Sequence, residues 1–477
     1  MRMDLLGKAG SSGVGLESSE HYSVINAKIQ NTKKIFLLYV PISIISAYIL
    51  FIFIMYSGIG RPIWMDEFLH FSLGGYDSVS DVLNVIRKTT AHVNHGQTGT
   101  YMLLDYLLLK IFGASAFALR LPSLLSGVLL LAAAFLFFRA RRVGFFGQIG
   151  FLIAISGQAE LLHYMGEARP YMPLAASAVG VLAYYSFPPE ERRSWPVVAL
   201  GWTSVILGAS MHPYFPVYWF VIFLFCYWMA WFDGRKVGTV ADALAFVNLP
   251  LSVVGTLLVF GIGAFTWLQG GPKFEFDPFQ WLTLGLWTTF TGFSHFQFVP
   301  EDALVVIVPA AAIPLLYLVT PRRLKPVLHG LVAPAILILL ALALSVLVGA
   351  TSYFRNYWIL PRQWVASMAL VPLGAVWLGY ELYRQVRRLH WVVGAAFALV
   401  ALYSLYGTVL PTLQLRTPVM QKWMSLAIAP SEGPAPRLEN EAVPTDNEGW
   451  VALANRNIQA GGPVWPIASM YYRAMVP

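Results

Sequence analysis

The chain has 477 residues, of which 57% are hydrophobic and 12% are charged, and its mean hydropathy is +0.62. Charged residues make up roughly a quarter of a typical soluble chain, so this composition excludes a soluble globular protein and predicts a polytopic membrane protein. The formal net charge of +8 comes mostly from basic residues in turns between apolar segments. Such turns suit contact with anionic lipid and give no reason to expect nucleic acid as a partner.

The first apolar segment, residues 35–55, contains no charged residue and is long enough to cross a hydrocarbon core about 30 Å thick. Residues 1–34 are polar, and no small-residue cleavage site follows the apolar run, so we expect the segment to remain as an anchor. The sequence predicts an all-α protein with about eleven transmembrane helices, the others at residues 121–138, 143–159, 171–187, 195–211, 214–232, 243–267, 303–320, 331–350, 364–383 and 391–409.

Arginine and lysine concentrate in alternate turns between these segments, at residues 139–142, 192–193, 235–236, 322–325 and 384–388. Because cytoplasmic loops are enriched in basic residues, this bias places the N-terminal segment, 1–34, in the cytoplasm. Residues 98–112, which carry Asp105 and Lys110, would invert the pattern if they spanned the membrane, so we predict an interfacial amphipathic helix there. The transmembrane domain, 35–410, then carries outer loops at 58–120 and 268–302, and a small outer tail follows at 411–477.

Asp66 and Glu67, just beyond the first predicted span, are the leading candidates for catalysis, because charges near the bilayer are costly to keep. His70 follows one turn later, and in a helix it shares a face with Asp66 at a spacing of i, i+4. An acidic first turn favoured by the helix dipole is the structural alternative.

Three more groups of polar residues lie in the predicted outer loops. Lys88 and His95, near Arg87 and His92, suit either a lipid-linked phosphate or ordinary headgroups. The turn that holds His163, Tyr164, Glu167, Arg169 and Tyr171 either contributes to a site or lets Glu167 and Arg169 neutralise each other. Tyr353, Arg355 and Arg362 either bind phosphate oxygens or snorkel to the interface. The histidine spacing does not indicate a metal site.

Three stretches carry a resemblance to a known family: WMDEF at 64–68, HGQTGTYMLLDYLLLKIFGASAFALRLPSLLSG at 95–127 and GEARPYM at 166–172. They resemble the first half of the dolichyl-phosphate-mannose-protein mannosyltransferase-like superfamily, and YWILPRQW at 357–364 resembles it more loosely. This is the GT-C class of membrane glycosyltransferases, which includes lipid A aminoarabinose transferases and rhizobial galacturonosyltransferase-like proteins. Where members of the family usually have His-Pro-Pro-Leu-Tyr, this chain has HGQTGTY at 95–101.

The resemblance implies that Asp66 is the catalytic base with Glu67 as its partner, and that Glu167 and Arg169 lie near the donor. The expected reaction transfers a sugar, with inversion, from a polyprenyl-phosphate donor such as an undecaprenyl-phosphate sugar to a hydroxyl acceptor. It takes place at the outer face of the bacterial inner membrane. The acceptor is lipopolysaccharide or another envelope glycan, or a protein. We expect a monomer that needs no nucleotide cofactor and for which a divalent metal is optional. A transporter or flippase of lipid-linked sugars is the alternative, with the outer acids and arginines lining a pathway.

Overall fold

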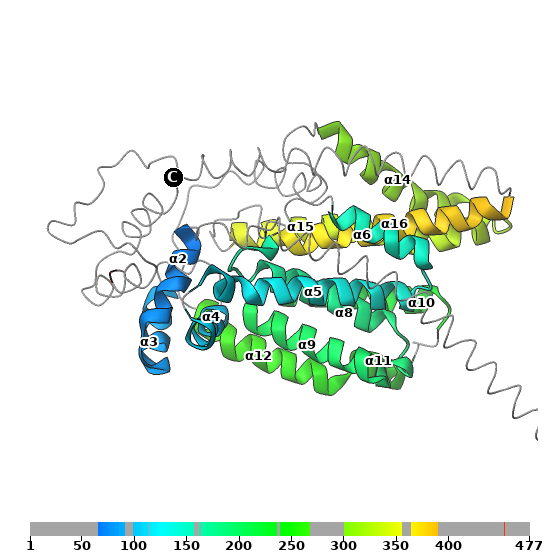
Figure 1. Ribbon diagram of the computed structural model, residues 1–477. Helices are drawn as coiled ribbons and strands as arrows, with labels where there is room; N and C mark the ends of the chain where they lie inside the picture. The colour runs from blue at the N-terminus through cyan, green and yellow to red at the C-terminus, as the bar shows by residue number, and fades with distance from the viewer. Residues whose placement is uncertain are drawn as a thin grey trace, which may run out of the picture. The chain divides into compact units, whose positions relative to one another are not determined.

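The computed structural model describes residues 65–90, 99–113, 115–156, 161, 164–235, 239–267, 300–354, 364–389 and 453. These residues belong to one compact unit, Ile52–Pro477. Every regular element within them is a helix, as predicted (Figure 1). Helices are the expected result, because a backbone among apolar side chains and lipid must satisfy its N–H and C=O groups internally.

Short helices come first in the described chain: α2 (Met65–Ser72), the 3-10 helix η1 (Leu73–Gly75), α3 (Val79–Thr90) and α4 (Gly99–Phe112). The helices that follow are mostly longer, with the 3-10 helix η2 (Glu191–Arg193) between two of them. They are α5 (Ala116–Ala140), α6 (Phe145–Ser156), α8 (Tyr171–Ser186), α9 (Trp195–Met211), α10 (Phe215–Phe232), α11 (Val240–Val247), α12 (Leu249–Trp267), α14 (Pro300–Val319), α15 (Lys325–Phe354) and α16 (Val365–Leu389).

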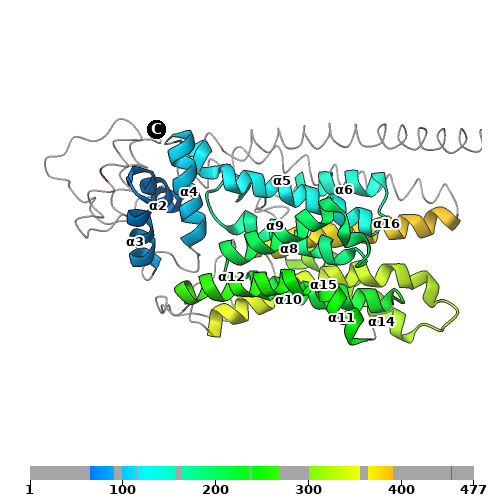
Figure 2. The ribbon, with the colours of Figure 1, turned by 90° about the horizontal axis from the view of Figure 1, so that it is seen from below.

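Helix α8 lies at the centre of the packing, where it contacts α5, α9, α10 and α16 (Figure 2). All of its residues are buried. Glycines permit the close approach to α9: a Cβ at Gly180 would overlap the hydroxyl of Ser204, and one at Gly201 would lie 2.5 Å from the ring of Tyr184. Small residues at helix contacts are typical of membrane proteins, in which tight packing replaces the hydrophobic effect between helices.

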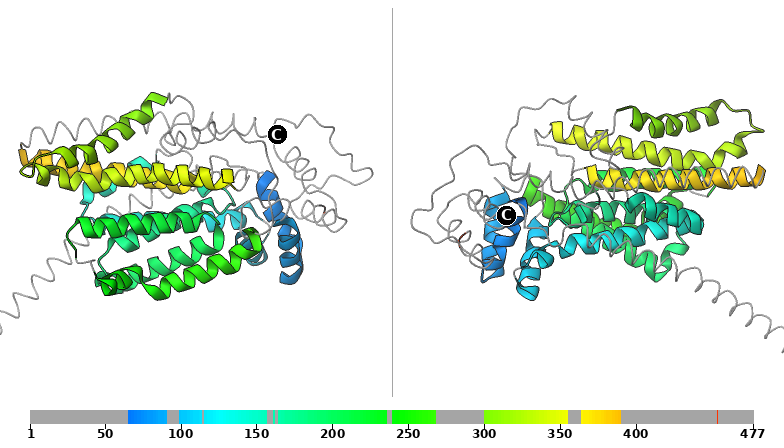
Figure 3. Two further views of the ribbon diagram at one scale, coloured as in Figure 1. Left: turned by 180° about the vertical axis from the view of Figure 1, so that it is seen from behind. Right: turned by 45° about the horizontal axis from the view of Figure 1, so that its top comes forward.

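Apolar side chains cover the outer helices as well as the core. Helix α14 lies at the edge of the bundle against α15 (Figure 3), and it exposes Leu315 and Leu318. Helix α12 exposes Leu257 and Phe260 in the same way. Large apolar side chains spread over long helices are the surface that lipid would solvate.

The number of predicted spans is only partly supported. Four stretches in the described chain are long and apolar enough to cross a membrane, and a bent pair, Val240–Val247 with Leu249–Ile262, makes a fifth if it forms one span. The four are Ala116–Ala140, Phe215–Phe232, Lys325–Ala350 and Val365–Val386. The predicted count of about eleven is therefore not confirmed. The predicted spans at 35–55 and 391–409 lie outside the described residues.

The predicted span at 243–267 is not one continuous helix. Helices α11 and α12 meet at an angle of 56°. Thr239 and Asp242 form a capping box that starts α11, and Asn248 ends it in the left-handed conformation with φ 53°. Pro250 explains the break, because it has no N–H to donate to the carbonyl four residues earlier.

The two ends of the bundle differ in chemistry. At one end Arg141, which caps α5, donates to Asp233 and to the carbonyl of Ser186, and Arg192 donates to the carbonyls of Phe187, Tyr185 and Phe246. Helices α2, α3 and α4 pack at the other end (Figure 1). Helix α5, about 37 Å long, runs from one end to the other. The basic turns predicted to be cytoplasmic at residues 139–142 and 192–193 therefore lie opposite Asp66 and Glu67.

Candidate functional site

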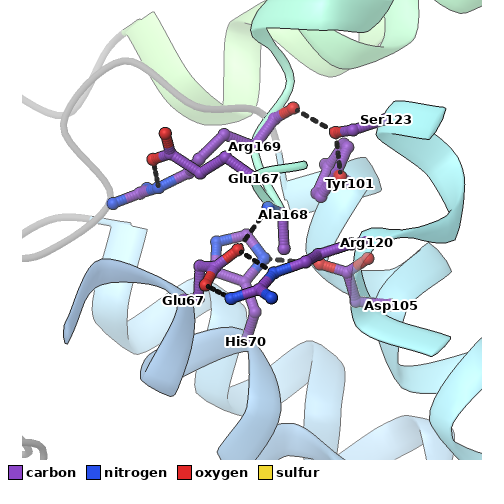
Figure 4. Close-up of polar contacts among 9 residues, drawn as sticks. All are labelled: Glu67, His70, Tyr101, Asp105, Arg120, Ser123, Glu167, Ala168 and Arg169. Atoms are coloured by element: carbon purple, nitrogen blue, oxygen red, sulfur yellow. Dashed lines mark hydrogen bonds and ion pairs between the residues drawn. The ribbon is translucent and has the colours of Figure 1, made fainter. Parts of the chain in front are cut away.

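Glu67 of α2 and Arg120 of α5 form a fully buried ion pair (Figure 4). Arg120 Nε donates to Glu67 Oε1 at 3.0 Å, and Nη2 donates to Oε2 at 2.6 Å. Glu67 Oε1 also accepts the backbone N–H of Ala168 at 2.7 Å. A guanidinium and a carboxylate that meet through two parallel bonds are strongly oriented. The pair therefore joins α2, α5 and the turn before α8 at one point.

The turn that contains Glu167 and Arg169 is held at Ala168 and at Arg169. The hydroxyl of Ser123 donates to the carbonyl of Arg169 at 3.0 Å, and it lies 2.8 Å from the hydroxyl of Tyr101. Since the single proton of Ser123 goes to that carbonyl, Tyr101 is the donor in the second bond. Arg169 Nε lies 4.0 Å from Glu167 Oε1. The two side chains form an ion pair, and the bonds of Glu67 and Ser123 to the backbone hold the turn in place.

His70 and Asp105 form a second buried pair. His70 Nδ1 lies 2.7 Å from Asp105 Oδ2, and both side chains are fully buried. The rings of Tyr101 and His70 meet edge to face, with their centroids 5.7 Å apart. Burial raises the pKa of the Asp105 carboxyl well above its usual range; the charge of Glu67 raises it further, while Arg169 lowers it. We infer that the pair shares one proton and does not leave Asp105 as an isolated anion.

Helix α4 was predicted to lie on the outer leaflet, and the structure refines that prediction. Residues 99–112 are helical, and Leu107, Ile111 and Phe112 are exposed. Asp105, however, points into the protein and holds His70. The partner on α2 offsets part of the cost of burying this carboxyl group, because His70 holds one of its oxygens, Oδ2.

Several of the predicted site residues have described positions. Asp66 lies in α2 one turn before His70, so the two residues share a helix face, as predicted for a helix here. Tyr164 and Tyr171 are buried, with ring centroids 5.6 Å apart, and Tyr171 also packs near His212. The structure describes the backbone but not the side chains of Asp66, Lys88 and Tyr353. Four predicted site residues lie outside the described residues: His95, His163, Arg355 and Arg362.

The sequence prediction omitted four residues of this cluster: Tyr101, Asp105, Arg120 and Ser123. The sequence could have indicated two of them, Asp105 and Arg120. Both are ionisable groups in or beside apolar segments, where a charge usually has a partner. Nothing in the sequence marks Tyr101 or Ser123. Across the described chain, no group of three or more His, Cys, Asp or Glu side chains is placed to hold a metal ion.

Together, the fold and this cluster define a helical membrane protein with paired buried charges at one end of its bundle. No family model and no curated protein matches the chain. Among solved structures, the chain is similar to ArnT from Cupriavidus metallidurans in the apo state, with 13% identity and a TM-score of 0.44 over 91% of this chain and 74% of that one. The same protein bound to undecaprenyl phosphate gives 14% identity and a TM-score of 0.42, over 91% and 75%.

Proposed function

We propose that the protein is a membrane glycosyltransferase that moves a sugar from a polyprenyl-phosphate donor to an acceptor hydroxyl at the outer face of the bacterial inner membrane. One observation carries the proposal. Buried contacts join the three stretches of the family resemblance, at 64–68, 95–127 and 166–172, into one cluster through Glu67, Arg120 and Ala168. The cluster lies at the end of the bundle opposite the basic turns, which is the outer end if those turns are cytoplasmic.

In the proposed reaction the acceptor oxygen attacks the anomeric carbon and inverts its configuration. The bond from that carbon to the phosphate oxygen breaks, and its electron pair stays on the polyprenyl phosphate. Asp66 takes the proton of the acceptor hydroxyl as general base. Both oxygens of Glu67 are already engaged by Arg120 and Ala168, which supports a holding role for Glu67 and leaves the proton transfer to Asp66.

The donor is proposed to lie with its polyprenyl tail in the bilayer and its phosphate at the interface, so a nucleotide is not required. Glu167 and Arg169 are candidates for contact with the sugar and the phosphate, because the contacts of Glu67 and Ser123 fix the backbone at Ala168 and Arg169. The remaining candidates for the donor site rest on the sequence alone. They are Lys88, His95, Tyr171, Tyr353, Arg355 and Arg362. Guanidinium groups are the usual partners of phosphate oxygens.

The test uses purified protein in proteoliposomes with a panel of radiolabelled undecaprenyl-phosphate sugars. Acceptors are extracted envelope glycolipids, glycans and membrane proteins. The expected result is release of undecaprenyl phosphate together with transfer of the label to one acceptor class. Asp81→Asn, a change to an exposed acid on α3, is the matched control that should keep the activity. Movement of intact donor across the bilayer without cleavage would instead identify a flippase and contradict the proposal.

A further inference from the structure

The backbone of Arg169 is fixed on both sides of its Cα atom. Its N–H donates to the carbonyl of Glu167 at 2.8 Å, which closes a three-residue turn, and its carbonyl accepts from the hydroxyl of Ser123 at 3.0 Å. Pro173, four residues later, has no N–H with which α8 could satisfy that carbonyl. A side chain of α5 therefore supplies the hydrogen bond that the helix backbone cannot.

Ser123 is itself held by Tyr101. The tyrosine donates to it at 2.8 Å, and both side chains are fully buried. Because hydrogen bonds in a chain polarise one another, this bond strengthens the one from Ser123 to the turn and orients the serine hydroxyl. Arg120 lies one turn earlier on the same face of α5 and holds the turn at a second point through its partner on α2.

The fixed backbone determines where the guanidinium of Arg169 lies. Figure 4 shows that the carbonyl of Arg169 faces Ser123, whereas its side chain extends away from Ser123 toward Glu167, whose Oε1 lies 4.0 Å from Nε. Loss of the bond from Ser123 would free the backbone from which this side chain starts. A charged group that is placed in advance loses less conformational freedom when it binds a ligand, so its position contributes directly to affinity.

We propose that Ser123 and Tyr101 are positioning residues that hold Arg169 ready for the phosphate of the polyprenyl donor; this rests on the proposed function, in which Arg169 contacts that phosphate. Neither hydroxyl touches the donor, and both act through the carbonyl of Arg169. Their loss should therefore weaken the binding of the donor without changing the chemistry at the anomeric carbon. The effect should also depend on the phosphate, because the polyprenyl tail has no part in this contact.

The test compares Ser123→Ala with Ser126→Ala in the purified protein. Ser126 is also a buried serine of α5, but its hydroxyl donates to the carbonyl of Pro122 within the same helix, so it is a matched control. The probes are undecaprenyl phosphate and undecaprenol, which lacks the phosphate. We expect Ser123→Ala to bind undecaprenyl phosphate about tenfold more weakly, a change comparable to the loss of one charge-assisted hydrogen bond. Its affinity for undecaprenol, and both affinities of Ser126→Ala, should stay at the wild-type values.

Steady-state kinetics give a second readout that a loss of folded protein alone would not produce. In Ser123→Ala the KM for the donor should rise about tenfold, while kcat stays within about twofold of wild type. A fall in kcat at constant KM would show that the serine supports the fold or the chemical step and does not position Arg169.

A double-mutant cycle shows whether Ser123 acts through Arg169. In an Arg169→Ala background, Ser123→Ala should cause no further loss of affinity for undecaprenyl phosphate. A full further loss in that background, or wild-type affinity in Ser123→Ala alone, would overturn the positioning role. Thermal unfolding checks that each variant is folded. If Ser123→Ala does not fold, Tyr101→Phe provides the same comparison, with Tyr218→Phe, which loses a buried bond to Ser367, as its control.

The two proposals fail in different ways. Absence of sugar transfer by the wild type contradicts the proposed function, and normal affinity of Arg169→Ala for undecaprenyl phosphate contradicts the contact between Arg169 and the phosphate. Weakened binding in Arg169→Ala together with normal binding in Ser123→Ala contradicts only the positioning role.

Discussion

Asp66 and Glu67 illustrate how two adjacent acids of one helix can take different roles. Successive side chains of an α-helix point about 100° apart. Glu67 is directed at Arg120 and the N–H of Ala168, where its charge is fully compensated in the buried interior. Its two oxygens are thus committed to partners on α5 and in the turn before α8, which suits a holding role.

The Glu67–Arg120 pair should be essential for stability. In Arg120→Met the carboxylate of Glu67 stays buried without its cation, which typically costs about 3–5 kcal/mol. We expect a marked fall in the unfolding temperature of the purified protein in detergent. Adding Glu67→Gln to this variant should recover part of the loss, because the uncompensated charge is then gone. If Arg120→Met unfolds at the wild-type temperature, the pair is not the clamp described here.

His212 should make stability depend on pH. It follows α9, accepts the N–H of Tyr214 at 3.2 Å, and burial lowers the pKa of its imidazole to about 3 from the usual 6.5. The unfolded chain therefore binds a proton between these values that the folded protein does not. The free energy of unfolding therefore has its full value above about pH 6.5 and decreases as the pH falls, by about 2 kcal/mol at pH 5.

The measurement for His212 compares unfolding temperatures of wild type and His212→Asn between pH 7 and pH 5. Asparagine can still accept the N–H of Tyr214 but does not titrate. The wild type should lose more stability on acidification than the variant does. Identical pH dependence in the two proteins would contradict the buried, neutral histidine.

At the scale of elements, the sequence predicted helices well and their interruptions poorly. Residues 195–211 were predicted as a helix with the bounds that α9 has, because a long apolar run has no alternative to a helix in a membrane. The break at Asn248 was missed because hydropathy continues unchanged across it. The Glu67–Arg120 pair was missed because its partners are 53 positions apart, and an arginine beside an apolar run ordinarily snorkels to the interface.

The break between α11 and α12 can be tested at Asn248. Its amide donates to the hydroxyl of Tyr184, and its φ of 53° suits asparagine or glycine. Asn248→Gly should lose only the side-chain hydrogen bond, whereas Asn248→Ala should lose about 1–2 kcal/mol more through backbone strain. Unfolding temperatures should therefore decrease in the order wild type, glycine variant, alanine variant. If the alanine variant is more stable than the glycine variant, the bend does not need a left-handed residue.

At the scale of the whole molecule, the chain separates its charges between the two ends of an apolar bundle. Exposed basic residues occupy the turn between α14 and α15, and the paired buried charges lie among α2, α4 and α5. Under the positive-inside rule, this separation predicts an orientation in which the cluster lies outside. A donor that presents its phosphate at the outer interface would then meet the site without leaving the bilayer.

Cysteine labelling in intact cells tests this orientation. Asp81 on α3 and Arg323 in the turn between α14 and α15 are both exposed, and they belong to opposite ends of the bundle. We replace Cys226 first, since it is the native thiol. Asp81→Cys should then react with a membrane-impermeant maleimide, and Arg323→Cys should react only after permeabilisation. The reverse pattern would place the cluster in the cytoplasm and contradict the proposed topology.

Single-turnover kinetics provide the decisive test of the proposal that Asp66 is the general base of sugar transfer. Asp66→Asn keeps the shape of the side chain and removes its basicity, so purified Asp66→Asn should bind the donor normally but transfer the sugar about 10²- to 10⁴-fold more slowly. The single-turnover transfer rate of Glu67→Gln, measured per folded molecule, should fall less than that of Asp66→Asn. Near-normal single-turnover transfer by Asp66→Asn would show that Asp66 is not the base.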